Sequence, residues 1–332
     1  SFNDPQLQAA ISEALAHNTD LRQAASTVLI VAQSINLAEA QMLPQIGGEL
    51  GETRTRDFDE HNTNAADQAN VVLAWELDIW GRLRAQKDAA QANYATAALD
   101  YAYARQSLAA TTAKSWFAAV QATQLLALAQ QSEAIYASLL TISQVRERAG
   151  KVAEFDVIQA QASLDGAQAS LQDAYNNLAI AKRNLELLMG RYPAAEIAVA
   201  LQSSTLPPAV DGSAPLSLLG RRPDVLAAEQ QVISAFRMLE ADRLALLPDF
   251  AFQLEVGRFS DNVISLLDLN PWMGHAEFGM QIPIYEGGAL VAQIAIGDAQ
   301  EQAAVANYGS VVLNAFNEVE TGLGNEHYYS KR

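Results

Sequence analysis

Alternation of apolar and polar residues with a period of two marks four stretches of the chain as β-strands. In one of them Val71, Leu73 and Trp75 are separated by Val72 and Ala74. The alternation is weakest in the first stretch and clear in the other three. We expect strands at about 45–56, 70–80, 249–259 and 275–285.

The two faces of these strands predict two different surroundings. An ordinary antiparallel sheet with one face on a core would show the same alternation. Carboxylates and glycines at the polar positions favour a membrane barrel with a wet lumen, as do Trp75, Trp80, Trp272 and Tyr285 in or beside the strands. The residues expected to face lipid are Val71, Leu73, Trp75, Leu77, Phe250, Phe252, Leu254, Phe278, Met280 and Ile282. Those expected to face the lumen are Glu76, Asp78, Asp249, Gln253, Glu255, Glu277 and Gln281.

Four strands are too few to close a barrel. An open edge facing lipid would leave backbone N–H and C=O groups without hydrogen-bond partners. Several chains must therefore share one barrel, and three copies would supply twelve strands, within the known range of outer-membrane barrels.

Long helices are predicted on either side of a short turn. Residues 83–149 contain neither proline nor glycine, and a helix of this length would be a rod of roughly 100 Å. Residues 154–189 alternate leucine and alanine at spacings of three and four, as in closely packed helix pairs. A soluble antiparallel coiled coil is the simpler explanation of this periodicity. Helices at about 20–43 and 154–189 are together nearly as long as the rod, so they could stack end to end alongside it.

The chain repeats one plan. A segment that begins with Asp20 leads through a helix to Leu43-Pro44 and a strand, and a segment that begins with Asp224 leads likewise to Leu247-Pro248. Both pairs of landmarks are 204 residues apart. We therefore expect a helix-strand-strand-helix unit in a first repeat (1–192) and again in an incomplete second repeat (218–332), with its long helix from about 289. Residues 193–217, rich in proline and serine, are expected to be a connector.

Composition excludes several functional classes. The chain carries 38 acidic and 21 basic residues, a net charge of −17, which argues against nucleic acid as a partner. It has no cysteine, and no run of 18 apolar residues that would form a transmembrane helix. None of its four histidines has a histidine partner at metal-ligand spacing, and neither phosphate-loop nor nucleophile-elbow motifs occur. We expect no enzyme activity, cofactor or metal site.

Several motifs carry a resemblance to a known family. They are residues 218–229 (LLGRRPDVLAAE), Asp78-Ile79-Trp80-Gly81-Arg82, residues 148–157 (RAGKVAEFDV) and the two Leu-Pro entries into strands. The sequence resembles the TolC-like outer-membrane efflux factors, and within them the OprM and NodT-type lipoproteins. The resemblance implies a homotrimer with a twelve-stranded barrel in the bacterial outer membrane, a helical tunnel through the periplasm and an equatorial belt. It also implies docking to an inner-membrane pump through a periplasmic adaptor.

The resemblance assigns roles to a few residues. Gly150, Lys151, Val152, Ala153 and Glu154 resemble the turn at the periplasmic tip where family adaptors dock.

Asp156 resembles a family carboxylate that helps to hold the tunnel closed. Acidic residues are also favoured at a helix start by the macrodipole alone, so a purely structural role stays open for it. Arg221, Arg222 and Asp224 are expected to fix a helix start.

One departure from the family pattern concerns the end of the given sequence. The second long helix, from Ala289 to Arg332, is shorter than the first, so we expect the returning segment that completes the family's gate to be missing. Another expectation concerns its start, where a lipid anchor could sit on a residue upstream of Ser1.

The function predicted is an outer-membrane channel component of a tripartite efflux or type I secretion system. It would be a passive exit duct for cargo driven by the pump, and its acidic lumen would favour cations. The alternative is a soluble periplasmic coiled-coil scaffold that binds protein partners and conducts nothing. The sequence carries no signature of the cargo.

Overall fold

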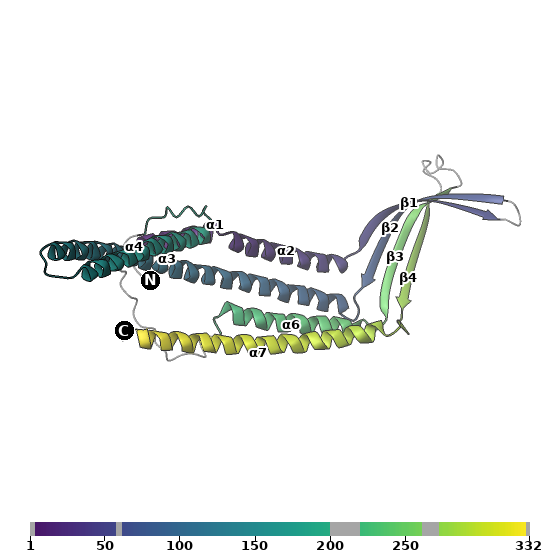
Figure 1. The fold of residues 1–332 in the computed structure, drawn as a ribbon. Coiled ribbons are helices and arrows are strands. Elements are labelled where there is room, and N and C mark those ends of the chain that lie inside the picture. The colour runs from purple at the N-terminus through teal and green to yellow at the C-terminus, as the bar shows by residue number, and fades with distance from the viewer. Residues whose placement is uncertain (1–3, 58–61, 200–219, 261–271, 330–332) are drawn as a thin grey trace. The chain divides into compact units, whose positions relative to one another are not determined.

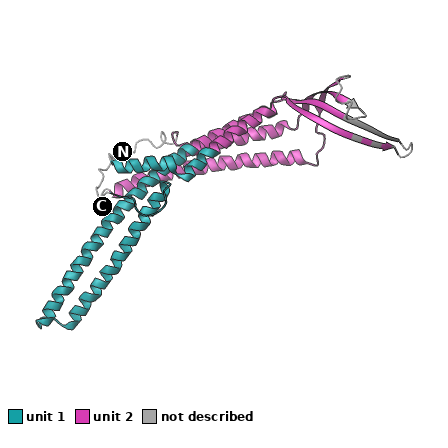
Figure 2. Ribbon diagram, turned by 90° about the horizontal axis from the view of Figure 1, so that it is seen from above, with its two compact units in different colours: residues 1–26, 101–212 teal, residues 27–100, 213–332 magenta. Residues whose placement is uncertain are grey.

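The computed structural model describes residues 4–57, 62–199, 220–260 and 272–329 (Figure 1). Its chain divides into two compact units, residues 1–26 with 101–212 and residues 27–100 with 213–332 (Figure 2). In chain order the helices and strands are α1 (Pro5–His17), α2 (Thr19–Gln41), β1 (Gln45–Asp57), β2 (Asn62–Leu77), α3 (Arg82–Arg148), α4 (Glu154–Leu188), α6 (Pro223–Leu244), β3 (Asp249–Ser260), β4 (Met273–Gln281) and α7 (Ala289–Tyr329).

The helix-strand-strand-helix order expected from the sequence occurs twice. α2, β1, β2 and α3 form one copy, and α6, β3, β4 and α7 form the other. α3 continues for 67 residues without a break, because no helix-breaking residue interrupts it. Across the described ranges, every helix is too short or too polar to cross a bilayer.

The ends of two strands differ from those expected. β2 begins at Asn62 and ends at Leu77, instead of running from about 70 to 80. Residues 62–69 are small or polar on both faces and give no alternation signal, yet their backbone pairs with β1. β4 runs from Met273 to Gln281 instead of 275–285, and Pro283 has no backbone N–H to extend the ladder. Residues 58–61, 261–271 and most of the expected connector (200–217) lie outside the described residues.

One antiparallel sheet, in the order β1-β2-β3-β4, joins the strands of the two copies. Its register places apolar side chains opposite each other, so that Trp75 is paired with Phe252 and Phe252 with Phe278. On the other face Glu76 is paired with Ala251. The separation of apolar and polar residues seen along each strand therefore continues across the whole sheet.

The described residues leave the apolar face of this sheet uncovered. Ile46 keeps 72% of its surface exposed, and Phe278 keeps 62%. The alternative in which this face packs on a core of the same chain is thus not what the described residues show. Within that part of the chain, the outer edges of β1 and β4 also pair with no other strand.

The unit that contains the N-terminal helix has its own core. The sequence pattern does not predict α1 as a separate helix, but Asp4 caps it by accepting hydrogen bonds from the backbone N–H groups of Gln6 and Leu7. α1 packs against α3 and the end of α4 through the buried residues Leu7, Ala10, Ala14, Trp116, Val120, Leu185 and Met189.

Asn18 separates α1 from α2 and ties their junction to α4. Its Oδ1 accepts a hydrogen bond from the N–H of Leu21 at 3.0 Å, and its Nδ2 donates to the carbonyl of Leu188 at 3.0 Å. The start of α2 therefore adjoins the end of α4. Gly190, with φ of +72°, allows the chain after α4 to pass close to His17.

We expect Gly190→Ala to destabilise the protein by about 2 kcal/mol or more. The left-handed backbone alone costs an alanine about 1–2 kcal/mol, and the new Cβ would lie 2.5 Å from the carbonyl oxygen of His17. Gly166→Ala is the matched control, because no atom lies within 4 Å of its Cβ position in α4 and the helix should gain up to about 1 kcal/mol. Unfolding of the purified proteins in detergent measures both changes, and an unchanged stability of Gly190→Ala would contradict the close approach.

Candidate functional site

Two tryptophans form hydrogen bonds between the sheet region and the backbone at the two Leu-Pro landmarks, where helices lead into strands. Trp75 Nε1 donates a hydrogen bond to the carbonyl of Met42 at 2.9 Å, just before Leu43-Pro44. Trp80 Nε1 donates to the carbonyl of Pro248 at 2.7 Å, in the second landmark. Each indole ring is largely apolar, and its one polar group, the N–H, is hydrogen-bonded to a backbone carbonyl just before a strand begins. The junction between helices and sheet is therefore fixed in both copies.

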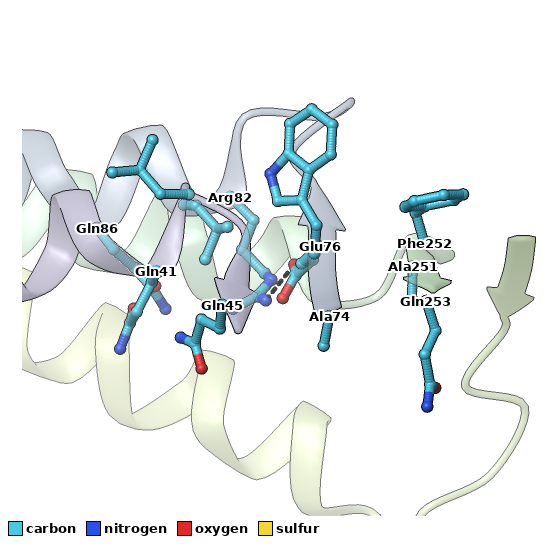
Figure 3. Close-up of a pocket in the computed structure, with 12 residues that line it drawn as sticks. Gln41, Gln45, Ala74, Glu76, Arg82, Gln86, Ala251, Phe252 and Gln253 are labelled. Atoms are coloured by element: carbon cyan, nitrogen blue, oxygen red, sulfur yellow. Dashed lines mark hydrogen bonds and ion pairs between the residues drawn. The ribbon is translucent and has the colours of Figure 1, made fainter. Parts of the chain in front are cut away.

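An arginine at the start of α3 joins two strands from their polar face. Arg82 Nη2 lies 2.5 Å from Glu76 of β2 (Figure 3). The Nε of Arg82 also lies 3.8 Å from Asp249 of β3. The Arg82–Glu76 pair lies at the wall of a cavity of about 540 Å³, which glutamines from α2, β1, α3 and β3 also line. At the base of the polar face, one cation thus offsets part of the charge of two carboxylates, and amide groups surround the pair.

Asp78 is not a strand residue, which corrects its expected place on the lumen face. Its carboxylate accepts hydrogen bonds from the N–H groups of Leu83 and Arg84 at 3.1 and 3.0 Å, and from Arg84 Nε at 3.1 Å. Burial raises the pKa of Asp78, but these donors outweigh it and leave the pKa below its ordinary 3.8. Asp78 caps α3, because the first N–H groups of a helix have no partner inside it.

The other expected lumen residues share one face of the sheet. Asp249, Gln253, Glu255, Glu277 and Gln281 alternate with the apolar residues of β3 and β4.

Two carboxylates on this face have partners other than arginine. Glu255 accepts a hydrogen bond from Asn70, and Glu277 lies 3.8 Å from the ring of His275. On the polar face, the arginine pairs described for Glu76 and Asp249 thus lie at the end of the sheet that adjoins the helices.

The expected lipid-facing residues occupy the opposite face, with one exception. Nine of them lie on β2, β3 or β4 in matching register. Ile282 lies just beyond the end of β4 at Gln281, so its placement on a strand is wrong.

The expected docking turn is a compact and exposed helix end. Gly150 has φ of +68°, and the N–H of Lys151 donates to the carbonyl of Arg146 at 2.9 Å, which closes α3 in a Schellman-type turn. Lys151, Ala153 and Glu154 are exposed. Asp156 accepts a hydrogen bond from the N–H of Ala153 at 3.0 Å, which agrees with the helix-start interpretation of this carboxylate.

The Arg-Arg-Pro-Asp segment starts α6, as expected. Pro223 is the first residue of the helix, and Arg222 holds Asp224 through two hydrogen bonds of 3.0 and 2.7 Å. The same guanidinium bonds Glu318 of α7 at 2.7 Å. Pairing with Arg222 keeps the pKa of Asp224 below its ordinary 3.8.

A buried carboxylate that the sequence did not reveal organises the chain after α4. Glu186 is only 3% exposed, and its oxygens accept hydrogen bonds from the N–H groups of Ala195, Glu196 and Ile197 at 2.7–2.9 Å. Ala195 has φ of +63°, a conformation that is rare outside glycine. Burial raises the pKa of Glu186, but the three N–H donors together lower it by more, so the pKa lies below its ordinary 4.5. An acidic residue in the last turn of a helix, where the macrodipole disfavours it, is the one sequence signal for such a role.

Among the described residues, no three or more His, Cys, Asp or Glu side chains form a group that could hold a metal. His17 contacts the backbone carbonyl of Glu13, and His275 lies beside Glu277. His61 lies outside the described residues.

These features define a class of protein. A sheet with one bare apolar face, one polar face and two open edges, carried on very long helices, is the architecture of an outer-membrane channel with a helical tunnel. The family model for outer membrane efflux proteins matches residues 10–191 and 214–325. The chain belongs to this family, and it is an outer-membrane channel component of an efflux system.

Individual relatives agree with this assignment. The cation efflux system protein CusC of Escherichia coli O6:H1 is 26% identical over 328 residues, with 97% of this chain and 70% of CusC covered. The solvent efflux pump outer membrane protein SrpC of Pseudomonas putida is 27% identical over 339 residues, with 100% and 72% covered. A crystal structure of CusC has a TM-score of 0.85 at 25% identity, over 99% of this chain and 77% of that one. The CmeC outer membrane channel of Campylobacter jejuni shares the fold with a TM-score of 0.91 at 20% identity, over 97% and 71%.

We expect Glu186→Gln to destabilise the protein at pH 7 by about 2 kcal/mol, because a neutral amide accepts weaker hydrogen bonds from the three N–H donors. Since the folded-state pKa lies below 4.5, the stability from ionised Glu186 is fully present above that pH. It is lost as the pH falls through the lowered pKa. Unfolding curves of both proteins between pH 7 and pH 3 should converge at the acidic end, and a gap that does not narrow would contradict the role of the ionised carboxylate.

Proposed function

We propose that this chain acts as a homotrimer and forms a passive exit duct for cargo driven by a separate pump. The bare apolar face with two unpaired edges supports the proposal most strongly. Pairing of β4 in one copy with β1 in the next would satisfy the edge groups of both strands. Three copies would then close one barrel with the apolar face toward lipid and the polar face toward a water-filled lumen.

Charge along the polar face suggests where the duct discriminates between ions. Arg82 pairs with Glu76 and Asp249 near the helices, whereas Glu255 and Glu277 have no arginine or lysine partner within the described residues. Carboxylates in a narrow aqueous passage raise the local concentration of cations and lower that of anions. The preference for cations would therefore arise toward the middle of the sheet.

The partners proposed for the duct are an inner-membrane pump and a periplasmic adaptor. The exposed turn at 150–154 is proposed as the docking point, and Asp156 as a gate residue that would reach a neighbouring hairpin in addition to capping α4. The relatives are named for cations in one case and for solvent in another, which supports a duct that leaves the choice of cargo to its pump. No catalytic step is required of such a duct.

The two matched segments of the family model support a duplicated chain. The first lies within the proposed repeat 1–192, and the second covers most of the proposed repeat 218–332 and begins four residues before it, in the connector of residues 193–217. Each repeat would contribute one hairpin to the barrel.

The membrane assignment can be tested with two neighbouring residues on opposite faces of β4. We expect Phe278→Lys to reduce recovery of trimers from outer membranes severely, because lysine facing mid-bilayer lipid costs about 2–4 kcal/mol in a barrel. Glu277→Lys should assemble normally but lower the ratio of cation to anion permeability in planar bilayers. Mass measurement after detergent extraction reports the trimer. If the Phe278→Lys protein and the wild type were both freely soluble and had the same mass, this would support the alternative, a soluble coiled-coil scaffold.

The docking assignment predicts a separate defect at the tip. We expect Val152→Lys to abolish efflux in cells that express pump and adaptor, because a bulky charge would occupy the turn that the adaptor contacts. Trimer yield should be unchanged. Gln131→Lys, an exposed position of α3 remote from the turn, is the matched control and should transport normally. Normal efflux by Val152→Lys would refute docking at this turn.

A further inference from the structure

Comparison of the two repeats reveals a difference at the start of their first helices. In the second repeat, the guanidinium of Arg222 lies between two carboxylates, at 2.7 and 3.0 Å from that of Asp224 on α6 and at 2.7 Å from that of Glu318 on α7. A cation thus links the first turn of α6 to the neighbouring long helix. Two carboxylates hold it in charge-assisted hydrogen bonds.

The first repeat has one of these carboxylates but not the cation. Asn18 and Asp20 precede Arg222 and Asp224 by the same 204 residues that separate the Leu-Pro landmarks. Thr111 lies 29 positions after the first residue of α3, as Glu318 does after the first residue of α7. Asparagine therefore replaces the arginine, and threonine replaces the second carboxylate.

All three counterparts in the first repeat line one cavity. This cavity of about 370 Å³ lies within a single unit, and it is also lined by Leu21, Tyr103, Ala104, Ser107, Leu108 and Leu188. Asn18 directs its amide to Leu21 and Leu188, so it does not reach the carboxylate of Asp20 as an arginine would. Among the described residues that line the cavity, Asp20 is the one charged side chain, and the structure gives it no ion pair within the described part of the chain. The cavity thus combines a single negative charge with a mainly apolar wall.

We propose that this cavity binds an organic cation with an apolar body, through its guanidinium or primary ammonium group. The charged group would lie against Asp20, in the place that Arg222 takes beside Asp224. The apolar body would pack on the leucines, and the ring of Tyr103 adds a favourable surface for a cation. The volume falls within the range typical of small-ligand sites. This inference rests on the proposed repeats and goes beyond the proposed exit duct.

Binding can be measured by calorimetry on the full-length protein in detergent, with n-hexylguanidinium as the probe. n-Hexylurea has nearly the same shape but no charge, so we expect it to bind at least fivefold more weakly. Asp20→Asn should weaken n-hexylguanidinium binding at least fivefold. Thr111→Glu restores the counterpart of Glu318 and should strengthen it about fivefold. Asp173→Asn, an exposed position elsewhere on α4, removes the same charge and should leave the affinity unchanged.

The outcomes separate this inference from the proposed function. Equal binding of the two probes, or unchanged affinity in Asp20→Asn, would overturn the cation site even if the protein is trimeric and conducts. Misfolding could lower the affinity for n-hexylguanidinium but could not raise it, so the gain of affinity expected for Thr111→Glu tests the site independently of folding. Failure to form trimers in the membrane would instead overturn the exit duct, and trimer mass recorded on the same samples distinguishes the two failures.

Discussion

The unpaired backbone at the edges of a four-stranded sheet is the constraint on which the architecture depends. One chain supplies a sheet whose apolar side chains are aligned across all four strands and lack a cover within the described residues. In lipid such a face is stable only if every N–H and C=O group is paired. In the proposed trimer, neighbouring copies complete the strand pairing, so folding of the barrel and assembly would be coupled events.

Polar side chains at the base of the sheet stabilise the junction between strands and helices. Trp75 and Trp80 satisfy their indole N–H groups on backbone carbonyls, and Arg82 joins β2 to β3. Asp78 begins α3. Alternation alone treats Asp78 as one more lumen carboxylate, because it continues the period of the strand. Only the return of the helix toward the strand end reveals its capping role.

The elements governed by a simple period could be predicted from sequence, and those governed by contacts between distant segments could not. The two faces of the sheet and the length of α3 follow from periods of two and from the absence of helix breakers. The extension of β2 to Asn62 depends on pairing with β1. The hydrogen bonds of the buried Glu186 carboxylate come from a loop nine residues or more further along the chain. The break between α1 and α2 had a readable signal in Asn18, since asparagine is favoured at helix starts. Arg222 was placed at a helix start, but its bond to Glu318 joins positions 96 residues apart.

Glycines at the two ends of α3 indicate where the chain can bend. Gly81 and Gly150, with φ of +90° and +68°, flank a helix that has no internal glycine or proline. Helices kink at such residues and otherwise curve only gently, so α3 resists sharp bending and its neighbouring glycines are the adaptable joints. A change in the direction of the chain is therefore expected at Gly81 or Gly150 rather than inside α3.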